Sequence, residues 1–112
     1  PNMVDYKHIN NIIWKKGYED HDDVIPTLIP NWDHSPRGGK NSLVFNHCTP
    51  ELWKEQAVKV INLTKNKSNK LIMLKSWNEW GEGNYMEPDL KYGKKIINIL
   101  ADSLKNDGGT DR

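Results

Sequence analysis

The chain has 112 residues and a mass of 13.0 kDa, which allows one domain and argues against two domains with separate cores. Hydrophobic residues make up only 36% of it and the mean hydropathy is −0.83, so little apolar surface is available for a core. The formal net charge of +1 argues against recognition of nucleic acid or anionic membranes through bulk charge, and we expect neither as a partner.

The cysteine content and the apolar runs limit the cellular setting. Cys48 is the single cysteine, which excludes a disulfide framework within the chain. No run approaches the ~18 apolar residues that a membrane-spanning helix requires, and the first residues show no signal peptide. We therefore expect a soluble, cytoplasmic protein without a membrane span.

The predicted elements alternate between helices and strands. Helices are indicated by apolar residues at helical spacing, and strands by short apolar runs between turn residues. A disordered tail is expected over 106–112, which leaves 1–105 as one domain. In chain order the sequence predicts a helix over 6–16, a short strand over 24–29, a long loop over 31–46 with a candidate strand at 43–45, a helix over 50–65, a buried strand over 70–74, a loop over 78–87 and a helix opened by Pro88 and Asp89.

This alternation predicts an α/β fold with parallel strands and right-handed crossovers. In such folds, ligands gather on the loops that follow the carboxyl ends of the strands. Two polar, aromatic-rich segments, 31–37 and 77–87, occupy that position in the predicted order. We therefore expect both segments to lie on one face of the molecule.

The segment over 76–88 carries the densest group of chemically active side chains. Its glycines at 81 and 83 permit a tight turn, so that two carboxylates can point toward a common space. Two carboxylates in different environments are the minimum that glycosidic-bond chemistry requires, one as an acid and one as a base or nucleophile, while aromatic rings beside them can stack on a sugar. The candidate catalytic residues are Glu79 and Glu82, and the candidate sugar contacts are Trp77, Asn78, Trp80, Tyr85 and Glu87.

The earlier segment adds three candidate substrate contacts, Trp32, Asp33 and Arg37. Arg37 is one of two arginines against fourteen lysines, so a fork-shaped donor stands where the chain otherwise uses lysine. Two interpretations stay open for it: a clamp for an acidic sugar or a diphosphate leaving group, or an ion pair with Asp33.

Two readings without catalysis are also compatible with these residues. The segment over 76–88 can be a surface turn whose tryptophans cover the end of a sheet. It can also belong to a carbohydrate-binding module, in which aromatic rings stack on sugars and glutamates only accept hydrogen bonds from hydroxyl groups.

Metal and cofactor sites are not predicted. His21, Asp22, Asp23, Asp33 and His34 are metal-ligand types, but their spacing matches no tetrahedral or calcium-loop pattern. The glycines at 38 and 39 precede Lys40 without the following serine or threonine of a phosphate-binding loop. Cys48 stands beside His47, yet neighbours in sequence seldom face each other, and we expect a small buried thiol.

The run over 76–93 reads Ser-Trp-Asn-Glu-Trp-Gly-Glu-Gly-Asn-Tyr-Met-Glu-Pro-Asp-Leu-Lys-Tyr-Gly. It closely resembles the C-terminal signature of WbsX-type glycosyltransferase-like proteins of bacterial surface-polysaccharide biosynthesis, which are similar to glycoside hydrolase family 99, the endo-α-mannosidases. The run over 30–37, Pro-Asn-Trp-Asp-His-Ser-Pro-Arg, resembles a second signature of that family. Gly81 departs from the mannosidases, which typically have histidine there.

The resemblance implies the C-terminal part of a (β/α)₈ barrel, comprising about two β/α units and a preceding helix. It assigns Glu79 as the base that helps a sugar 2-hydroxyl attack its own anomeric carbon, and Glu82 as the acid that protonates the leaving oxygen. The incoming group can be water, as in a retaining endo-glycosidase, or an acceptor sugar, with a nucleotide sugar as possible donor. A barrel takes ~200–400 residues, so we expect the 112 residues alone to be inactive and their open strand edges to favour self-association.

Overall fold

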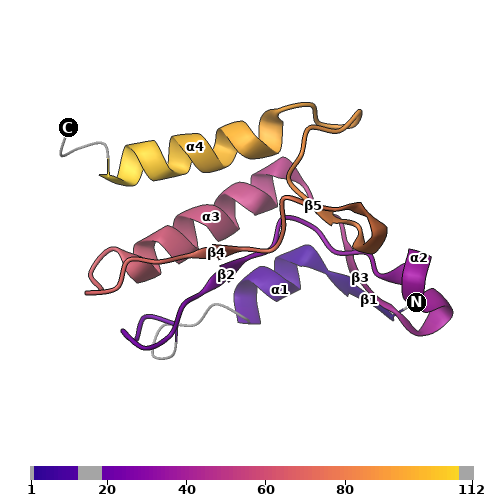
Figure 1. The fold of residues 1–112 in the computed structure, drawn as a ribbon, viewed down its shortest axis with the longest axis horizontal. Coiled ribbons are helices and arrows are strands. Elements are labelled where there is room, and N and C mark those ends of the chain that lie inside the picture. Colours follow the sequence, from indigo (N-terminus) through magenta and orange to yellow (C-terminus); the bar gives the residue numbers. More distant parts are fainter. Residues whose placement is uncertain (1, 13–18, 109–112) are drawn as a thin grey trace.

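The structure is a computed structural model that describes residues 2–12 and 19–108. Helices and strands alternate along the chain, as predicted; α1 and α3 lie near the short strands, and α4 packs along α3 (Figure 1). The α/β class is thereby confirmed. The helices are α1 (Tyr6–Ile12), α2 (Ser35–Gly38), α3 (Pro50–Thr64) and α4 (Lys95–Gly108), with short 3₁₀ helices η1 (Gly39–Asn41) and η2 (Trp80–Glu82).

The strands pair in three separate two-stranded sheets. Two pairs are parallel, β1 with β3 and β2 with β4, and in each pair helices and one further strand lie between the two members along the chain; β5 and β6 form an antiparallel hairpin. The described residues contain no closed sheet, so the assignment to a (β/α)₈ barrel stays a prediction. The strands are β1 (Asn2–Asp5), β2 (Thr27–Leu28), β3 (Leu43–Asn46), β4 (Met73–Leu74), β5 (Asn78–Glu79) and β6 (Asn84–Tyr85).

Helix α3 is the centre of the core and begins and ends close to its predicted bounds. Thr49 caps it by accepting a hydrogen bond from the amide of Leu52 at 3.2 Å, and Pro50 occupies the first turn, where no amide donor is needed. Trp53 and Val60 are fully buried on its inner face. The indole of Trp53 donates to the carbonyl of Ile96 at 3.0 Å, which ties α3 to α4 along its side (Figure 1).

A buried polar group joins α1, β2 and α3. Gln56 on α3 is fully buried, and its Nε2 donates to the Tyr6 hydroxyl at 2.7 Å and to Oδ1 of Asn10 at 3.0 Å. Its Oε1 accepts the amide of Ile29 at 2.7 Å. Because every polar atom of this amide is satisfied, a polar side chain is accommodated in a core with few apolar residues.

Two strands differ from their predicted form. The run over 24–29 pairs only at Thr27–Leu28, between two prolines that cannot donate to a ladder. The strand predicted as buried over 70–74 pairs only at Met73–Leu74, and its burial was wrong, because Leu71 and Met73 are 54% and 58% exposed. Only the alternate residues of this strand pack against the core, and nothing in the described part of the chain covers its other face.

The helix predicted from Pro88 begins later, at Lys95. Before it, the amide of Tyr92 donates to Oδ1 of Asp89 at 2.7 Å, and Gly93 adopts a positive φ of 58°. These features form a turn in place of a first helical turn. At its other end α4 continues to Gly108, inside the predicted disordered tail.

The N-terminal region and the loops contain elements that the sequence pattern did not indicate. The strand β1 was missed, and α1 is described only to Ile12; the remainder of the predicted helix, with Trp14, lies outside the described residues. The segments predicted as loops contain α2 and the β5–β6 hairpin, while the candidate strand at 43–45 is confirmed as β3.

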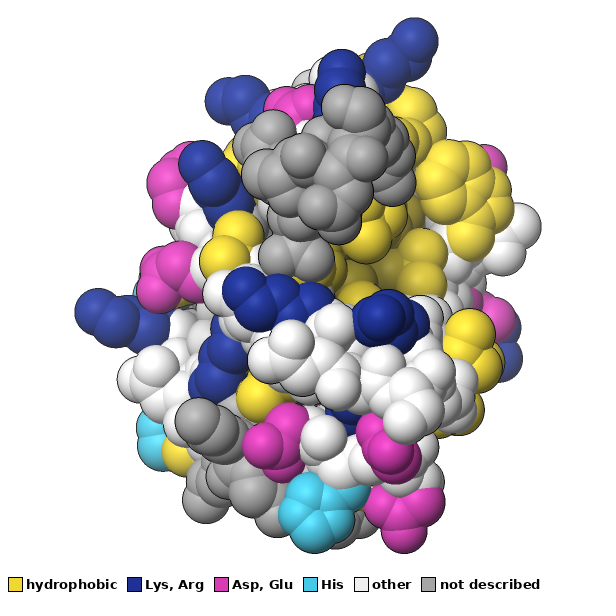
Figure 2. Space-filling model, turned by 90° about the vertical axis from the view of Figure 1, so that its left-hand side faces the viewer, with side chains coloured by type: hydrophobic (Ala, Val, Ile, Leu, Met, Phe, Trp, Pro, Cys, Tyr) yellow, Lys and Arg dark blue, Asp and Glu magenta, His cyan; other side chains and the backbone are white. Residues whose placement is uncertain are grey.

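Charges of both signs are mixed at one end of the molecule. Figure 2 shows the end of the molecule opposite α2, where lysine and carboxylate side chains are interspersed around an apolar hollow. This face therefore carries charges of both signs and no single patch of one sign.

Candidate active site

The two polar, aromatic-rich segments lie against each other, as predicted from their positions after strands. The amide of Asp33 donates to the carbonyl of Glu82 at 2.9 Å, and the amide of Tyr85 donates to Oδ1 of Asn31 at 2.8 Å. Both segments therefore form one end of the molecule, where α2 and the β5–β6 hairpin meet (Figure 1).

The hairpin owes its tight turn to Gly83. Gly83 has a positive φ of 54° at the end of η2, a conformation that glycine adopts without steric cost. A Cβ atom at this position would lie 2.6 Å from Cβ of Asp33 and 2.9 Å from its backbone nitrogen and oxygen. Gly83 is thus needed both for the turn and for the close approach of the two segments.

Asn84 is the buried centre of this contact, and it was not among the site residues predicted from the sequence. Its side chain is fully buried, and its Nδ2 donates to the backbone carbonyls of Asn31 and Lys75, both at 2.8 Å. The backbone carbonyl of Asn84 accepts a hydrogen bond from the hydroxyl of Ser76 at 2.6 Å. One side chain thereby joins the loop after β2, the loop after β4 and the hairpin.

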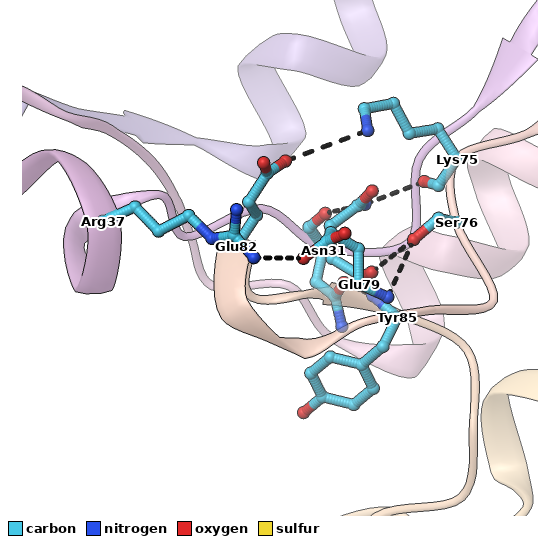
Figure 3. Close-up of polar contacts among 8 residues, drawn as sticks. Asn31, Arg37, Lys75, Ser76, Glu79, Glu82 and Tyr85 are labelled. Atoms are coloured by element: carbon cyan, nitrogen blue, oxygen red, sulfur yellow. Dashed lines mark hydrogen bonds and ion pairs between the residues drawn. The ribbon is translucent and has the colours of Figure 1, made fainter.

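The first predicted catalytic residue, Glu79, is paired with a cation from the other segment. Its Oε1 lies 3.1 Å from Nη2 of Arg37, in the last turn of α2 (Figure 3). The two side chains are 39% and 57% exposed, so the pair borders solvent. Arg37 pairs with Glu79 and not with Asp33, which overturns one of the two interpretations of this arginine.

Asp33 has a different partner. Its Oδ1 accepts hydrogen bonds from the amide of Ser35 at 2.9 Å and from the Ser35 hydroxyl at 2.5 Å. This carboxylate therefore orders the first residues of α2, the helix that carries Arg37.

The second predicted catalytic residue, Glu82, faces another cation. Its Oε1 lies 3.9 Å from Nζ of Lys75, and this ammonium group lies 5.3 Å from the ring centroid of Trp32. Glu82 is less exposed than Glu79, at 21%. Lys75 was not predicted as a site residue, because nothing in a lysine after an apolar run distinguishes it from a solvated one.

The hairpin divides the predicted residues into two groups. Figure 3 shows the ring of Tyr85 pointing away from the side on which the glutamates meet Arg37 and Lys75. On the side to which the Tyr85 ring points, Trp80 stacks on this ring with the centroids 3.7 Å apart. The indole of Trp80 donates to Oε1 of Glu87 at 2.6 Å.

A cavity of about 620 Å³ lies on the aromatic side of the hairpin. Among its lining residues are Trp32, Asp33, Trp80, Tyr85 and Glu87, five of the predicted substrate contacts. The hydroxyl of Tyr85 donates to Oδ2 of Asp89 at 2.8 Å. The pKa of Tyr85 is raised to about 12, mainly because the phenol is partly buried and also because of this hydrogen bond. The phenol is therefore protonated and acts as a donor at physiological pH.

The remaining predicted contacts are Trp77 and Asn78, and both are exposed to solvent. Trp77 holds the hairpin through its backbone, because its carbonyl accepts the amides of Met86 and Glu87. Its indole is 48% exposed, so its predicted contact with a sugar rests on the sequence alone.

Cys48 and His47, which lie outside the hairpin, contact other parts of the chain. Burial raises the pKa of the Cys48 thiol to about 12, and its Sγ contacts the carbonyl of Phe45 at 3.5 Å. Nδ1 of His47 lies 3.2 Å from Oδ2 of Asp5, so this imidazole contacts a carboxylate. Within residues 2–12 and 19–108, no three His, Cys, Asp or Glu side chains are grouped so that they could hold a metal ion.

Comparison with known proteins bears on these two segments together. The family model described as "Glycosyltransferase WbsX" matches residues 1–100, which include both segments and the helix between them. The chain belongs to the WbsX glycosyltransferase family. The resemblance expected from the sequence is thereby confirmed, and the chain is related to carbohydrate-active enzymes.

Two curated relatives are uncharacterized proteins named WxcX, from two strains of Xanthomonas campestris pv. campestris. Each is 21% identical over 105 residues, which cover 91% of this chain and 15% of the relative. The chain thus spans about one seventh of the length of these relatives. No solved structure matches it significantly. No helix among the described residues has the length and apolar character that crossing a membrane requires.

Proposed function

We propose that this chain supplies the paired-glutamate site of an enzyme that forms or cleaves glycosidic bonds during bacterial surface-polysaccharide biosynthesis. The observation that carries the proposal is the arrangement of Glu79 and Glu82 on one hairpin, each beside a cation from outside the hairpin. Family membership supports the carbohydrate class, and the local environments support different roles for the two carboxylates, since Glu82 is the less exposed.

In the proposed reaction, Glu79 accepts the proton of a sugar 2-hydroxyl while that oxygen attacks the anomeric carbon of the same sugar. The bond from the anomeric carbon to the leaving oxygen breaks, and this oxygen takes a proton from Glu82. The product of this step is a 1,2-anhydro sugar. An incoming hydroxyl group then opens the ring and returns a proton to Glu82, while the 2-oxygen recovers its proton from Glu79, so the anomeric configuration is retained.

The cations support these roles by electrostatics. A carboxylate that must accept a proton is most useful when it is held in one orientation, and the hydrogen bond from Arg37 at 3.1 Å provides this for Glu79. Lys75 lies at a longer distance from Glu82, 3.9 Å, and also over Trp32. It can remain near a leaving oxygen without forming a tight pair with the acid.

The aromatic side of the hairpin faces away from Glu79 and Glu82, so we place there the part of the carbohydrate beyond the reacting ring. Trp32 borders the cavity of about 620 Å³, a volume that accommodates a sugar ring or two. Trp80 and Glu87 present a ring face and a carboxylate there, a combination suited to the apolar face and the hydroxyl groups of a sugar. The remaining parts of a (β/α)₈ barrel would complete the pocket in the longer protein.

Hydrolase and transferase differ only in the incoming group, water or a sugar hydroxyl. The test is a screen of the full-length protein against nucleotide sugars and mannose-containing oligosaccharides, with products followed by NMR. We expect a product whose anomeric configuration matches that of the donor. An inverted product would contradict the roles given to the two glutamates, and sugar binding without any turnover would indicate a carbohydrate-binding module.

A further inference from the structure

Gly81 is a glycine for which the backbone gives no reason. Positive φ angles occur at three glycines of the described chain, Gly39, Gly83 and Gly93, and Gly81 is not one of them. Its backbone lies in η2, a conformation open to any residue. The reason for a glycine must therefore lie in what surrounds it.

The guanidinium group of Arg37 occupies the space next to Gly81. A Cβ atom built at Gly81 would lie 2.8 Å from Nη2 and 2.9 Å from Nε of this arginine, closer than real Cβ contacts. The same Nη2 donates to Oε1 of Glu79 at 3.1 Å. The flat edge of the guanidinium group thus lies against a bare stretch of backbone while it holds the carboxylate two residues earlier.

Hydrogen bonds near Arg37 and near Gly81 hold both partners of this contact in place. Arg37 stands in the last turn of α2, whose first residues are ordered by the hydrogen bonds from Ser35 to Asp33. The amide of Asp33 in turn donates to the carbonyl of Glu82, on the other side of Gly81 from Glu79. The distance between α2 and η2 is therefore fixed independently of the ion pair.

We propose that Gly81 and Arg37 are a matched pair, in which the missing side chain admits the guanidinium group and the guanidinium group orients the carboxylate of Glu79. Arg37 is then a positioning residue that acts through Glu79. The catalytic part of this inference rests on the proposed function, whereas the fit between Gly81 and Arg37 does not. A lysine cannot replace the arginine fully, because its compact ammonium group cannot lie flat on the backbone and reach the carboxylate together.

The experiment is a double-mutant cycle in the full-length protein, with Gly81→Ala, Arg37→Ala and the double variant. We expect each single variant to lower kcat by about tenfold to hundredfold with KM changed by less than about threefold. The double variant should be no slower than Arg37→Ala, because the added methyl group has no guanidinium left to displace. Arg37→Lys should recover part of kcat, and the matched control Lys54→Ala, on the exposed side of α3, should leave it unchanged.

Losses that multiply in the double variant would overturn the proposal, because the two residues would then act independently. A loss confined to KM would also overturn it, because Arg37 would then contact substrate and not orient Glu79. The thermal midpoints of the single variants should stay within a few degrees of the parent, since the displaced atoms are the end of a flexible side chain.

A second readout needs no turnover. The rate at which phenylglyoxal modifies Arg37, followed by peptide mass spectrometry, should rise in Gly81→Ala and rise to a similar extent in Glu79→Gln. An unchanged rate in Gly81→Ala would overturn the matched pair. A parent protein without activity on any sugar would instead overturn the proposed function and the catalytic part, while the modification rates still decide whether Gly81 admits Arg37.

Discussion

The backbone amide of Asp33 donates a hydrogen bond to the carbonyl oxygen of Glu82 at 2.9 Å. This contact joins the two segments that carry nearly all of the candidate site residues. It also brings α2 close enough to the hairpin for Arg37 to reach Glu79. The site therefore depends on a backbone contact that involves none of its side chains.

The close approach behind Gly83 is the first point to test. We expect Gly83→Ala to destabilise the chain by about 3 kcal/mol or more, because it adds left-handed strain and a clash with the backbone of Asp33. Gly93→Ala is the matched control, since Gly93 also has a positive φ but a Cβ there would meet nothing within 4 Å. It should cost only about 1–2 kcal/mol. Equal losses in urea unfolding would show that the contact with Asp33 is unimportant.

Removal of the Asn84 amide should weaken the site from within. In Asn84→Ala the carbonyls of Asn31 and Lys75 lose their donor inside the protein, which we expect to lower the free energy of unfolding by about 2–3 kcal/mol. Asn98→Ala, at an exposed position of α4, should change it by less than about 0.5 kcal/mol. Similar values for the two variants would contradict the role of Asn84 as the buried centre of the contact.

The thiol of Cys48 should be unreactive at neutral pH. Its pKa of about 12 leaves a far smaller thiolate fraction at pH 8 than that of a free cysteine, so alkylation by iodoacetamide should be roughly a thousandfold slower. Because burial raises this pKa, the rate should continue to climb with pH well above pH 9. Alkylation of the native chain as fast as that of the urea-unfolded chain would contradict the buried environment.

The elements with strong local signals were predictable from the sequence. The helix α3 follows from Thr49, Pro50 and Glu51, a cap, a first-turn proline and a carboxylate near the helix dipole, together with apolar residues at helical spacing. The two polar segments were placed on one face because both follow strands in an α/β order, and their hydrogen bonds confirm this.

Features that depend on distant partners were not predictable. The strand β1 has no apolar run and exists through its pairing with β3, and the exposed face of β4 depends on which elements cover it. The cations beside the glutamates come from outside the hairpin, Arg37 from α2 and Lys75 from the residue after β4, so neither pairing can be predicted from the spacing within 76–88. The division of the hairpin into two sides follows from the alternation of side chains in β5 and β6, which was hidden while the segment was treated as an irregular loop.

The most direct test of the central claim is the turnover number of Glu82→Gln in the full-length protein, compared with Glu55→Gln at an exposed position of α3. The proposed acid predicts that Glu82→Gln abolishes turnover while ligand affinity stays within about tenfold of the parent, because the amide keeps the shape of the side chain but cannot deliver the proton. Glu55→Gln should keep the parental rate. Turnover of Glu82→Gln at the parental rate would contradict the account.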